Sequence, residues 1–255
     1  MHDDSSSFRP CVFIPVFNHH QVLGQTLARI EAMGVPILLI DDGSEASSHA
    51  HLQRLLTVHT GVQMITHSHN RGKGGAIKTG LREAARLGFS HALQIDADGQ
   101  HNTDDVPRFL ALAKAAPDTL IAGKPAYDDS VPKIRFYCRY LTHGLVWLNT
   151  LSLQVEDSMC GFRVYPVRAS CQLLDEEPMG ERMDFDTEFM VRWHWRQWPL
   201  QQTATRVIYP ENGISHFLMW RDNKLITWMH VRLFAGMVWR LPRILARKFQ
   251  RQKAR

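Results

Sequence analysis

The stretch ALQIDADGQH, residues 92–101, decides the fold class of this chain. It begins as a short apolar run typical of a buried strand and then changes to carboxylates, an amide and an imidazole. Two other apolar runs, residues 36–40 and 62–66, are followed by the polar clusters DDGS (41–44) and NRGKGG (70–75). Ligands of open parallel sheets bind beyond the carboxyl ends of the strands, so the three clusters predict one polar rim.

Strand and helix patterns alternate through the first half of the chain. Strands are expected at 11–16, 36–40, 62–66, 92–95 and 120–122, between helices over 20–33, 46–58, 74–87 and 102–116. Strands separated by helices of this length build βαβ units, so the prediction is an α/β protein with a mostly parallel sheet flanked by helices. In the looser second half, helices are expected over 134–151 and 186–198 and strands at 162–165 and 205–209.

The composition excludes several descriptions of the whole chain. Its 255 residues are 44% apolar and 22% charged, which excludes disorder, collagen and coiled coil. The four cysteines form no C-x-x-C pair, so buried thiols in a reducing compartment are expected. No basic and apolar leader and no run of 18 uncharged apolar residues occurs, so neither a secretory signal nor a transmembrane helix is expected.

The net charge of +5 is unevenly distributed along the chain. Residues 217–255 contain ten Lys or Arg and one acid, whereas the remaining residues contain 20 bases and 24 acids. On a helical wheel, the apolar residues of 226–245 gather beside four arginines, a pattern that suits the surface of an anionic bilayer. Pro242 is expected to kink or end this helix. The alternative is a helix packed on the domain with a solvated basic end.

Asp96 and Asp98 are two residues apart, so in an extended segment their side chains point the same way. Two adjacent carboxylates repel by about 4 kcal/mol at an effective dielectric constant of 20, and a divalent cation removes that cost. Hard oxygen ligands suit Mg²⁺ or Mn²⁺, and Gln100 can add a neutral oxygen. The glycine-rich cluster matches neither the P-loop nor the dinucleotide fingerprint, but it can present backbone N–H groups and Lys73 to phosphate.

Together these segments resemble the motifs of family-2 glycosyltransferases with the GT-A fold, in the family's order. The segments are PVFN (15–18), DDGS (41–44), NRGKG (70–74) and DADGQ (96–100). The DADGQ form is similar to the polyprenyl-phosphate, or dolichol-phosphate, mannosyl- and glucosyltransferase branch, as are DSMCGFR (157–163) and FDTE (185–188). The resemblance covers about residues 11–210.

The resemblance implies a Rossmann-like site for a nucleotide sugar. The residues expected to bind it are Pro15, Phe17, Asn18, Asp41, Asp42, Lys73, Asp96, Ala97 and Asp98, with Asp42 and Asp41 on the nucleoside. The expected ligands of Mg²⁺ or Mn²⁺ on the donor diphosphate are Asp96, Asp98 and Gln100. The expected catalytic residues are Asp186, Glu188 and Arg163, and the expected acceptor or phosphate contacts are Arg135, Arg139, Asp157 and His216.

The function expected from this resemblance is metal-dependent, inverting transfer of a sugar from a nucleotide-diphosphate sugar to a lipid-linked or membrane-associated acceptor. A hydroxyl acceptor needs a general base, whereas a phosphate acceptor needs cations such as Arg135 or Arg139, and both stay open. Residues 8–213 are expected to form the glycosyltransferase domain and residues 214–255 a tail on the inner face of the cell membrane. The alternatives are a nucleotidyltransferase of related fold and a nucleic-acid-binding protein that uses the basic tail.

Overall fold

Within the described parts of the chain, seven strands form one sheet. The computed structural model describes residues 8–19, 22–126, 133–207 and 218–253. The strands are β1 (Pro10–Val16), β2 (Ile37–Asp41), β3 (Val62–Thr66), β4 (His91–Gln94), β5 (Leu120–Ala126), β6 (Arg163–Pro166) and β7 (Leu200–Arg206). Their order is β3-β2-β1-β4-β6-β5-β7, and β6 runs antiparallel to β4 and β5. The other pairs are parallel, which confirms the predicted mostly parallel α/β sheet.

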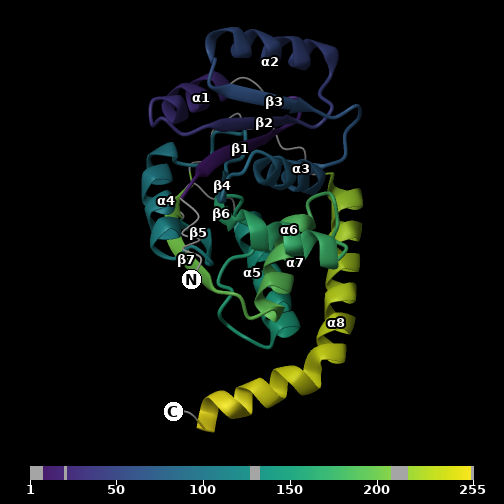
Figure 1. Cartoon of the computed structure of the whole chain (residues 1–255). Coiled ribbons are helices and arrows are strands. Elements are labelled where there is room, and N and C mark those ends of the chain that lie inside the picture. The colour runs from purple at the N-terminus through teal and green to yellow at the C-terminus, as the bar shows by residue number, and fades with distance from the viewer. Residues whose placement is uncertain (1–7, 20–21, 127–132, 208–217, 254–255) are drawn as a thin grey trace.

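Helices cover both faces of this sheet (Figure 1). They are α1 (Leu23–Glu31), α2 (Ala46–Val58), α3 (Lys73–Arg86), α4 (Val106–Ala115), α5 (Lys133–Thr150), α6 (Val167–Glu176), α7 (Phe185–Trp195) and α8 (Met219–Lys253), with a 3-10 turn η1 (Thr103–Asp105). Successive strand residues point to opposite faces, so Val12 and Ile14 of β1 pack with α1 and α4. Cys11 and Phe13 pack with α3, α6 and α7 on the other face. The sheet is therefore the middle of three layers.

Two elements differ from the sequence prediction. No element was expected at α6, although Pro166 at its N-cap, followed by buried Val167, Leu173 and Leu174, is a helix signal. A proline is compatible with a helix start because its missing N–H would have no intrahelical partner there. β7 begins at Leu200 instead of residue 205, because it pairs with β5 along its full length.

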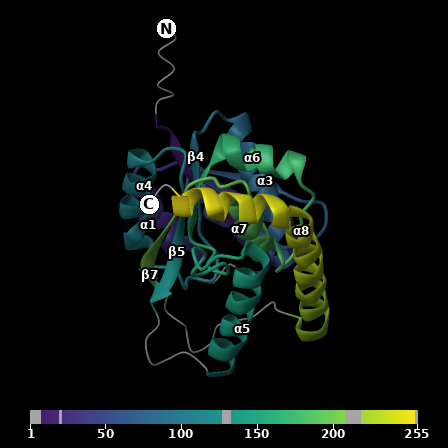
Figure 2. The same cartoon turned by 90° about the horizontal axis from the view of Figure 1, so that it is seen from below.

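Helix α8 belongs in part to the main core. Its residues Met229, Leu233 and Met237 are buried in the same apolar cluster as α7. Pro242 lies inside α8, and the helix changes direction along its length (Figures 1 and 2). A kink is expected because proline lacks the N–H and its ring clashes with the preceding turn. In the described part of the chain, every helix is too short or too polar to cross a bilayer.

Candidate active site

Loops meet at the carboxyl edge of the sheet, as the sequence predicts. Val16 and Asp41 are in register, so the loops after β1 and β2 start level with each other. Asn18 joins these loops, because its N–H donates to Ser44 Oγ at 3.0 Å and its Oδ1 accepts from Glu45 N–H at 2.9 Å. Asn18 has a φ of 51°, a left-handed conformation that asparagine tolerates better than most residues. The PVFN motif therefore shapes the rim through its last residue.

Asp41 and Asp42, which are expected to contact a nucleoside, lie inside the protein beside the rim. Neither residue is more than 2% exposed. Asp41 pairs with His49 Nδ1 at 2.7 Å. Asp42 accepts the backbone N–H groups of Arg71 and Gly72 at 2.9 and 2.7 Å. These carboxylates fix the loops that surround them.

Lys73 joins the rim of the sheet to helix α7. Its Nζ lies 2.8 Å from Asp96 Oδ2 and 3.0 Å from Asp186 Oδ2. Burial alone would lower the pKa of Lys73, but attraction by Asp186 and Asp96 outweighs burial and raises that pKa. A Cβ on Gly74 would lie 2.5 Å from Phe185 Cβ, so glycine lets the start of α3 reach the start of α7. Lys73 is therefore a charged bridge between two carboxylates.

Asp96 is fixed by neighbours that the sequence analysis did not identify. Its Oδ1 accepts from Gln94 Nε2 at 3.0 Å, and Gln94 Oε1 accepts from the Tyr165 hydroxyl at 2.8 Å. A Cβ on Gly161 would lie 2.4 Å from Asp96 Oδ2, so a larger residue would displace the carboxylate. Burial alone would raise the pKa of Asp96, but Lys73 outweighs burial and lowers it. The polar Gln94 inside an apolar strand was the available signal.

Asp98 has different surroundings from Asp96. It is partly exposed, and its Oδ1 accepts from the backbone N–H of Gln100 at 3.0 Å. In the described residues, no group of three or more His, Cys, Asp or Glu side chains is arranged to hold a metal ion. An oxygen ligand at Asp98 still fits Mg²⁺, which usually binds one or two carboxylates together with substrate phosphates.

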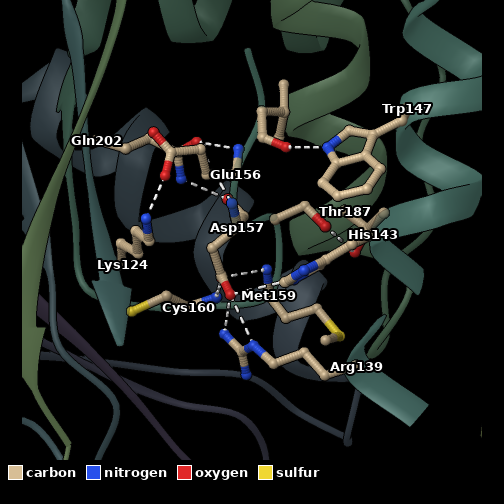
Figure 3. A network of polar contacts seen from close by, with 12 residues as sticks. Lys124, Arg139, His143, Trp147, Glu156, Asp157, Met159, Cys160, Thr187 and Gln202 are labelled. Carbon is tan, nitrogen blue, oxygen red and sulfur yellow. Dashed lines mark hydrogen bonds and ion pairs between the residues drawn. The ribbon is translucent and has the colours of Figure 1, made fainter. Parts of the chain in front are cut away.

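Asp157 anchors the loop before β6 (Figure 3). Its Oδ1 accepts the N–H groups of Met159 and Cys160 at 2.9 and 2.8 Å. Its Oδ2 accepts from Arg139 Nε at 2.6 Å and lies 3.3 Å from His143 Nε2. Burial alone would raise the pKa of Asp157, but His143 and Arg139 outweigh burial and lower it. Arg139, expected as an acceptor contact, is therefore already paired with Asp157, which was expected in the same role.

Arg163, which is expected to be catalytic, is fully buried. Its guanidinium donates to the carbonyls of Ser158, Cys160 and Asp186 at 2.6, 2.8 and 3.0 Å. Its Nη1 also lies 3.6 Å from Asp186 Oδ1. Arg163 therefore clamps the loop before β6 onto the first turn of α7.

The two acids of the FDTE segment face different partners. Asp186 binds Lys73 through Oδ2, and its buried Oδ1 has no hydrogen-bond partner in the described part of the chain. Glu188 is fully buried and accepts from Arg192 Nη2 at 2.7 Å and from Arg232 Nη2 at 3.1 Å. The structure brings Asp186 to the rim, whereas Glu188 ties α7 to α8.

The remaining predicted residues are placed as follows. Pro15 is buried in β1, Phe17 is half-buried after it, and Ala97 is buried in the DADGQ loop. The side chain of Arg135 and the whole of His216 lie outside the described residues.

The chain matches the glycosyl transferase family 2 over residues 11–169 and therefore belongs to that family of enzymes. It is 28% identical over 227 residues to a dolichyl-phosphate beta-glucosyltransferase of Drosophila melanogaster, across 80% of this chain and 68% of that protein. It is 22% identical over 220 residues to a UDP-N-acetylglucosamine–dolichyl-phosphate N-acetylglucosaminyltransferase of Methanococcus voltae, across 80% of this chain and 87% of that protein. These findings confirm the resemblance read from the motifs.

The fold is similar to that of a solved glycosyltransferase. The mannosyltransferase PcManGT from Pyrobaculum calidifontis, in complex with GDP-Man and Mn²⁺, superposes with a TM-score of 0.54 at 15% identity. The match covers 93% of this chain and 73% of that chain. The predicted GT-A fold is confirmed.

Proposed function

We propose that this glycosyltransferase moves a sugar, with inversion, from a nucleotide-diphosphate sugar to a phosphate-bearing lipid. The observation that carries the proposal is the Lys73 bridge from Asp96 to Asp186, because it joins the donor rim to the later part of the chain. Transfer requires donor and acceptor to meet at one anomeric carbon. The dolichyl-phosphate transferases among the relatives support a polyprenyl phosphate as the acceptor.

The donor would occupy the rim formed by the loops after β1, β2 and β4. The N-terminus of α3 and the charge of Lys73 favour a diphosphate there. Asp98, with the amide oxygen of Gln100, would hold Mg²⁺ or Mn²⁺, as the Mn²⁺ bound with GDP-Man in PcManGT suggests. When bound, the cation offsets the charge of the leaving diphosphate as a Lewis acid. Asp96 keeps Lys73 in place instead of competing for the metal.

A phosphate acceptor fits the charges at the start of α7. Such an acceptor is already anionic, so it attacks the anomeric carbon without a general base. Lys73 compensates Asp186, which reduces the repulsion of an arriving phosphate. Arg139 is paired with Asp157, and Lys73 is paired with Asp96 and Asp186, so either cation would exchange a carboxylate for the acceptor phosphate.

Replacement of Asp98 by alanine tests the transferase proposal. We expect at least a hundredfold loss of labelled-sugar transfer to polyprenyl phosphate in detergent with Mn²⁺, because the only proposed carboxylate ligand is removed. A thermal-shift panel of UDP-, GDP- and dTDP-sugars would identify the donor and should lose its Mn²⁺ dependence in the variant. Asp104→Ala removes an exposed carboxylate from η1 and serves as the matched control. Full activity of Asp98→Ala would refute the proposal.

A hydroxyl acceptor is the second candidate. Asp186 Oδ1 favours it, because this oxygen accepts no hydrogen bond within the described residues, with Arg163 Nη1 at 3.6 Å as an ion-pair neighbour. A hydroxyl needs a general base within hydrogen-bond reach, and a buried carboxylate oxygen without a donor can accept its proton. The product distinguishes the two acceptors, because mild acid releases sugar from a glycosyl phosphodiester but leaves a simple glycoside intact. An acid-stable product would identify a hydroxyl acceptor and rule out the phosphate acceptor.

We also propose that α8 holds the enzyme peripherally on an anionic membrane, at its inner, cytoplasmic face. Large apolar side chains stay exposed along this helix and its start: Leu218, Met219, Trp220, Trp228, Val231, Phe234, Val238, Trp239 and Leu245. Tryptophan and aliphatic side chains of this kind partition into the bilayer interface. Arg232 and Arg240, expected to face lipid, instead contact Glu188 and the Trp195 ring. The exposed apolar side chains therefore carry this proposal.

Co-sedimentation with vesicles that contain an anionic lipid tests the membrane proposal. Deletion of residues 217–255 is unsuitable, because it would remove core residues such as Met229 and Leu233. We instead expect Trp220→Ser combined with Trp239→Ser to weaken binding about tenfold or more, from the lost burial of two indoles. Val58→Ser changes an exposed apolar residue of α2 and is the control. Unchanged binding of the double tryptophan variant would show that α8 does not contact the bilayer.

A further inference from the structure

A cavity of about 390 Å³ lies at the end of α7 opposite to Asp186. Its lining comes from the ends of α5 and α7, from α8 and from the residue after α6. Its charged and aromatic lining residues include Glu177, Trp195, Arg196, Arg240 and Arg243. A helix rises 1.5 Å per residue, so Trp195 is about 14 Å along α7 from Asp186. The cavity is therefore separate from the site of sugar transfer.

The charge of the lining is positive, because three arginines face one carboxylate. Glu177 Oε1 lies 3.1 Å from Arg196 Nη2 and 3.6 Å from Arg240 Nη2. Glu177 Oε2 is bound by Arg192 from outside the lining. In the described part of the chain, no carboxylate forms an ion pair with Arg243. From outside the lining, Glu176 also pairs with Arg196 and Glu188 with Arg192. The positive charge left without its own carboxylate is therefore that of Arg240, which shares Glu177, and that of Arg243.

Arg240 lies among other positively charged side chains. Burial, together with repulsion by Arg192, Arg196 and Arg243, lowers the pKa of Arg240 despite the attraction of Glu177. Its guanidinium also lies over the Trp195 ring at 4.5 Å. Such a stacked guanidinium keeps N–H groups in a planar fork that matches phosphate oxygens. An anion in the cavity would relieve the repulsion and accept these N–H groups.

The volume of the cavity and its lining residues indicate which class of ligand it can hold. A volume of this size is within the range of small-molecule sites and exceeds the need of a bare ion. Ser152 and the amide of Gln154 line the same space, as a polar headgroup would require, whereas the Thr150 hydroxyl donates to the Val146 carbonyl. Val238 and Trp239, which are exposed, precede the lining arginines of α8 in the sequence. The cavity is thus built by the same part of α8 that exposes apolar side chains.

We propose that this cavity is a second binding site, which takes a phosphate-bearing polar group such as a phospholipid headgroup or a soluble phosphate ester. The two sources share the chemistry of a phosphate held by the guanidinium groups of Arg196, Arg240 and Arg243. The proposal depends on neither the identity of the sugar donor nor that of the acceptor.

Binding measurements on the full chain test this proposal with two probes. One probe is glycerol 3-phosphate, measured by calorimetry, and the other is vesicles of phosphatidylcholine with and without phosphatidylglycerol, measured by flotation. Arg243→Gln should weaken binding of the relevant probe about tenfold, the effect of one charge-assisted hydrogen bond. Arg221→Gln removes the same charge from an exposed position near the start of α8 and should bind like the wild type.

The outcomes separate the sources of phosphate. Binding of glycerol 3-phosphate that is lost in Arg243→Gln identifies a soluble ester as a ligand. Binding only to phosphatidylglycerol vesicles, weakened by Arg243→Gln but not by Arg221→Gln, identifies a lipid headgroup. Equal weakening by both variants shows a general charge effect and overturns the proposal, as does the absence of binding to both probes.

Discussion

Replacement of Lys73 by methionine tests the charge arrangement at the centre of the site. Lys73 Nζ contacts Asp96 at 2.8 Å and Asp186 at 3.0 Å, so these two carboxylate oxygens are close neighbours. Their separation is at most about 6 Å, at which two unit charges repel by about 3 kcal/mol at an effective dielectric constant of 20. Lys73→Met should therefore lower the free energy of unfolding by about 3 kcal/mol, or raise the pKa of one carboxyl by about two units.

Urea unfolding at pH 7.5 and at pH 5 measures this effect. The loss of unfolding free energy in Lys73→Met should be smaller at pH 5, because a proton then neutralises one carboxylate in place of the missing cation. Asp186→Asn in the same chain removes the repulsion, so the double variant should recover most of the loss. Lys114→Met removes an exposed lysine from α4 and is the control. A deficit under about 1 kcal/mol, or no recovery by Asp186→Asn, would refute the reasoning.

Three further variants address the supports of the site. Asp157→Asn should cost about 3 kcal/mol at pH 7. Because the pKa of Asp157 is lowered, its contribution to stability is present above about pH 4 and is lost as the pH falls. The variant should therefore lose less stability on acidification than the wild type does, which denaturation at several pH values would show. Arg163→Lys cannot reach three carbonyls at once, so stability should fall by about 2 kcal/mol or more, and an unchanged urea midpoint would argue against the clamp. His230 is a buried residue of α8 whose Nδ1 lies 3.1 Å from Asn149 Nδ2 of α5. Burial lowers the pKa of His230, so its contribution to stability is present above about pH 6.5 and lost on acidification. His230→Asn should reduce the loss of thermal stability between about pH 7 and pH 5, and a profile identical to the wild type would contradict this assignment.

The first half of the fold was predictable because its strands are apolar runs separated by complete helices. The predicted bounds of α2 and β3 agree with the structure. The start of β7 was not predictable in this way, because its sequence LQQTATR is mostly polar and its pairing with β5 is a tertiary effect. The antiparallel direction of β6 was also not predictable, because the alternation of side chains along a four-residue strand is the same in both directions.

The motifs identified the loops of the site better than the roles of single side chains. Asp42 follows β2 and Arg163 begins β6. Burial turns Asp42 toward backbone N–H groups and Arg163 toward backbone carbonyls. Glu188 lies two residues beyond Asp186 on a helix, where residues two apart do not share a face. Its contact with Arg232 depends on where α8 packs, which no local pattern in the FDTE segment specifies.

The antiparallel strand β6 has a consequence for the order in which the protein folds during synthesis. β6 lies between β4 and β5 in the sheet, although both of these strands precede it in the chain. On the ribosome, β4 and β5 therefore emerge without the strand that joins them, and pairings of large sequence separation close slowly. The loop that meets Asp96 arrives with β6, and the Glu188 pairing to α8 completes only after Arg232 has emerged. Until β6 and α8 have emerged, nascent chains expose the unpaired edges of β4 and β5, and such edges favour association between chains.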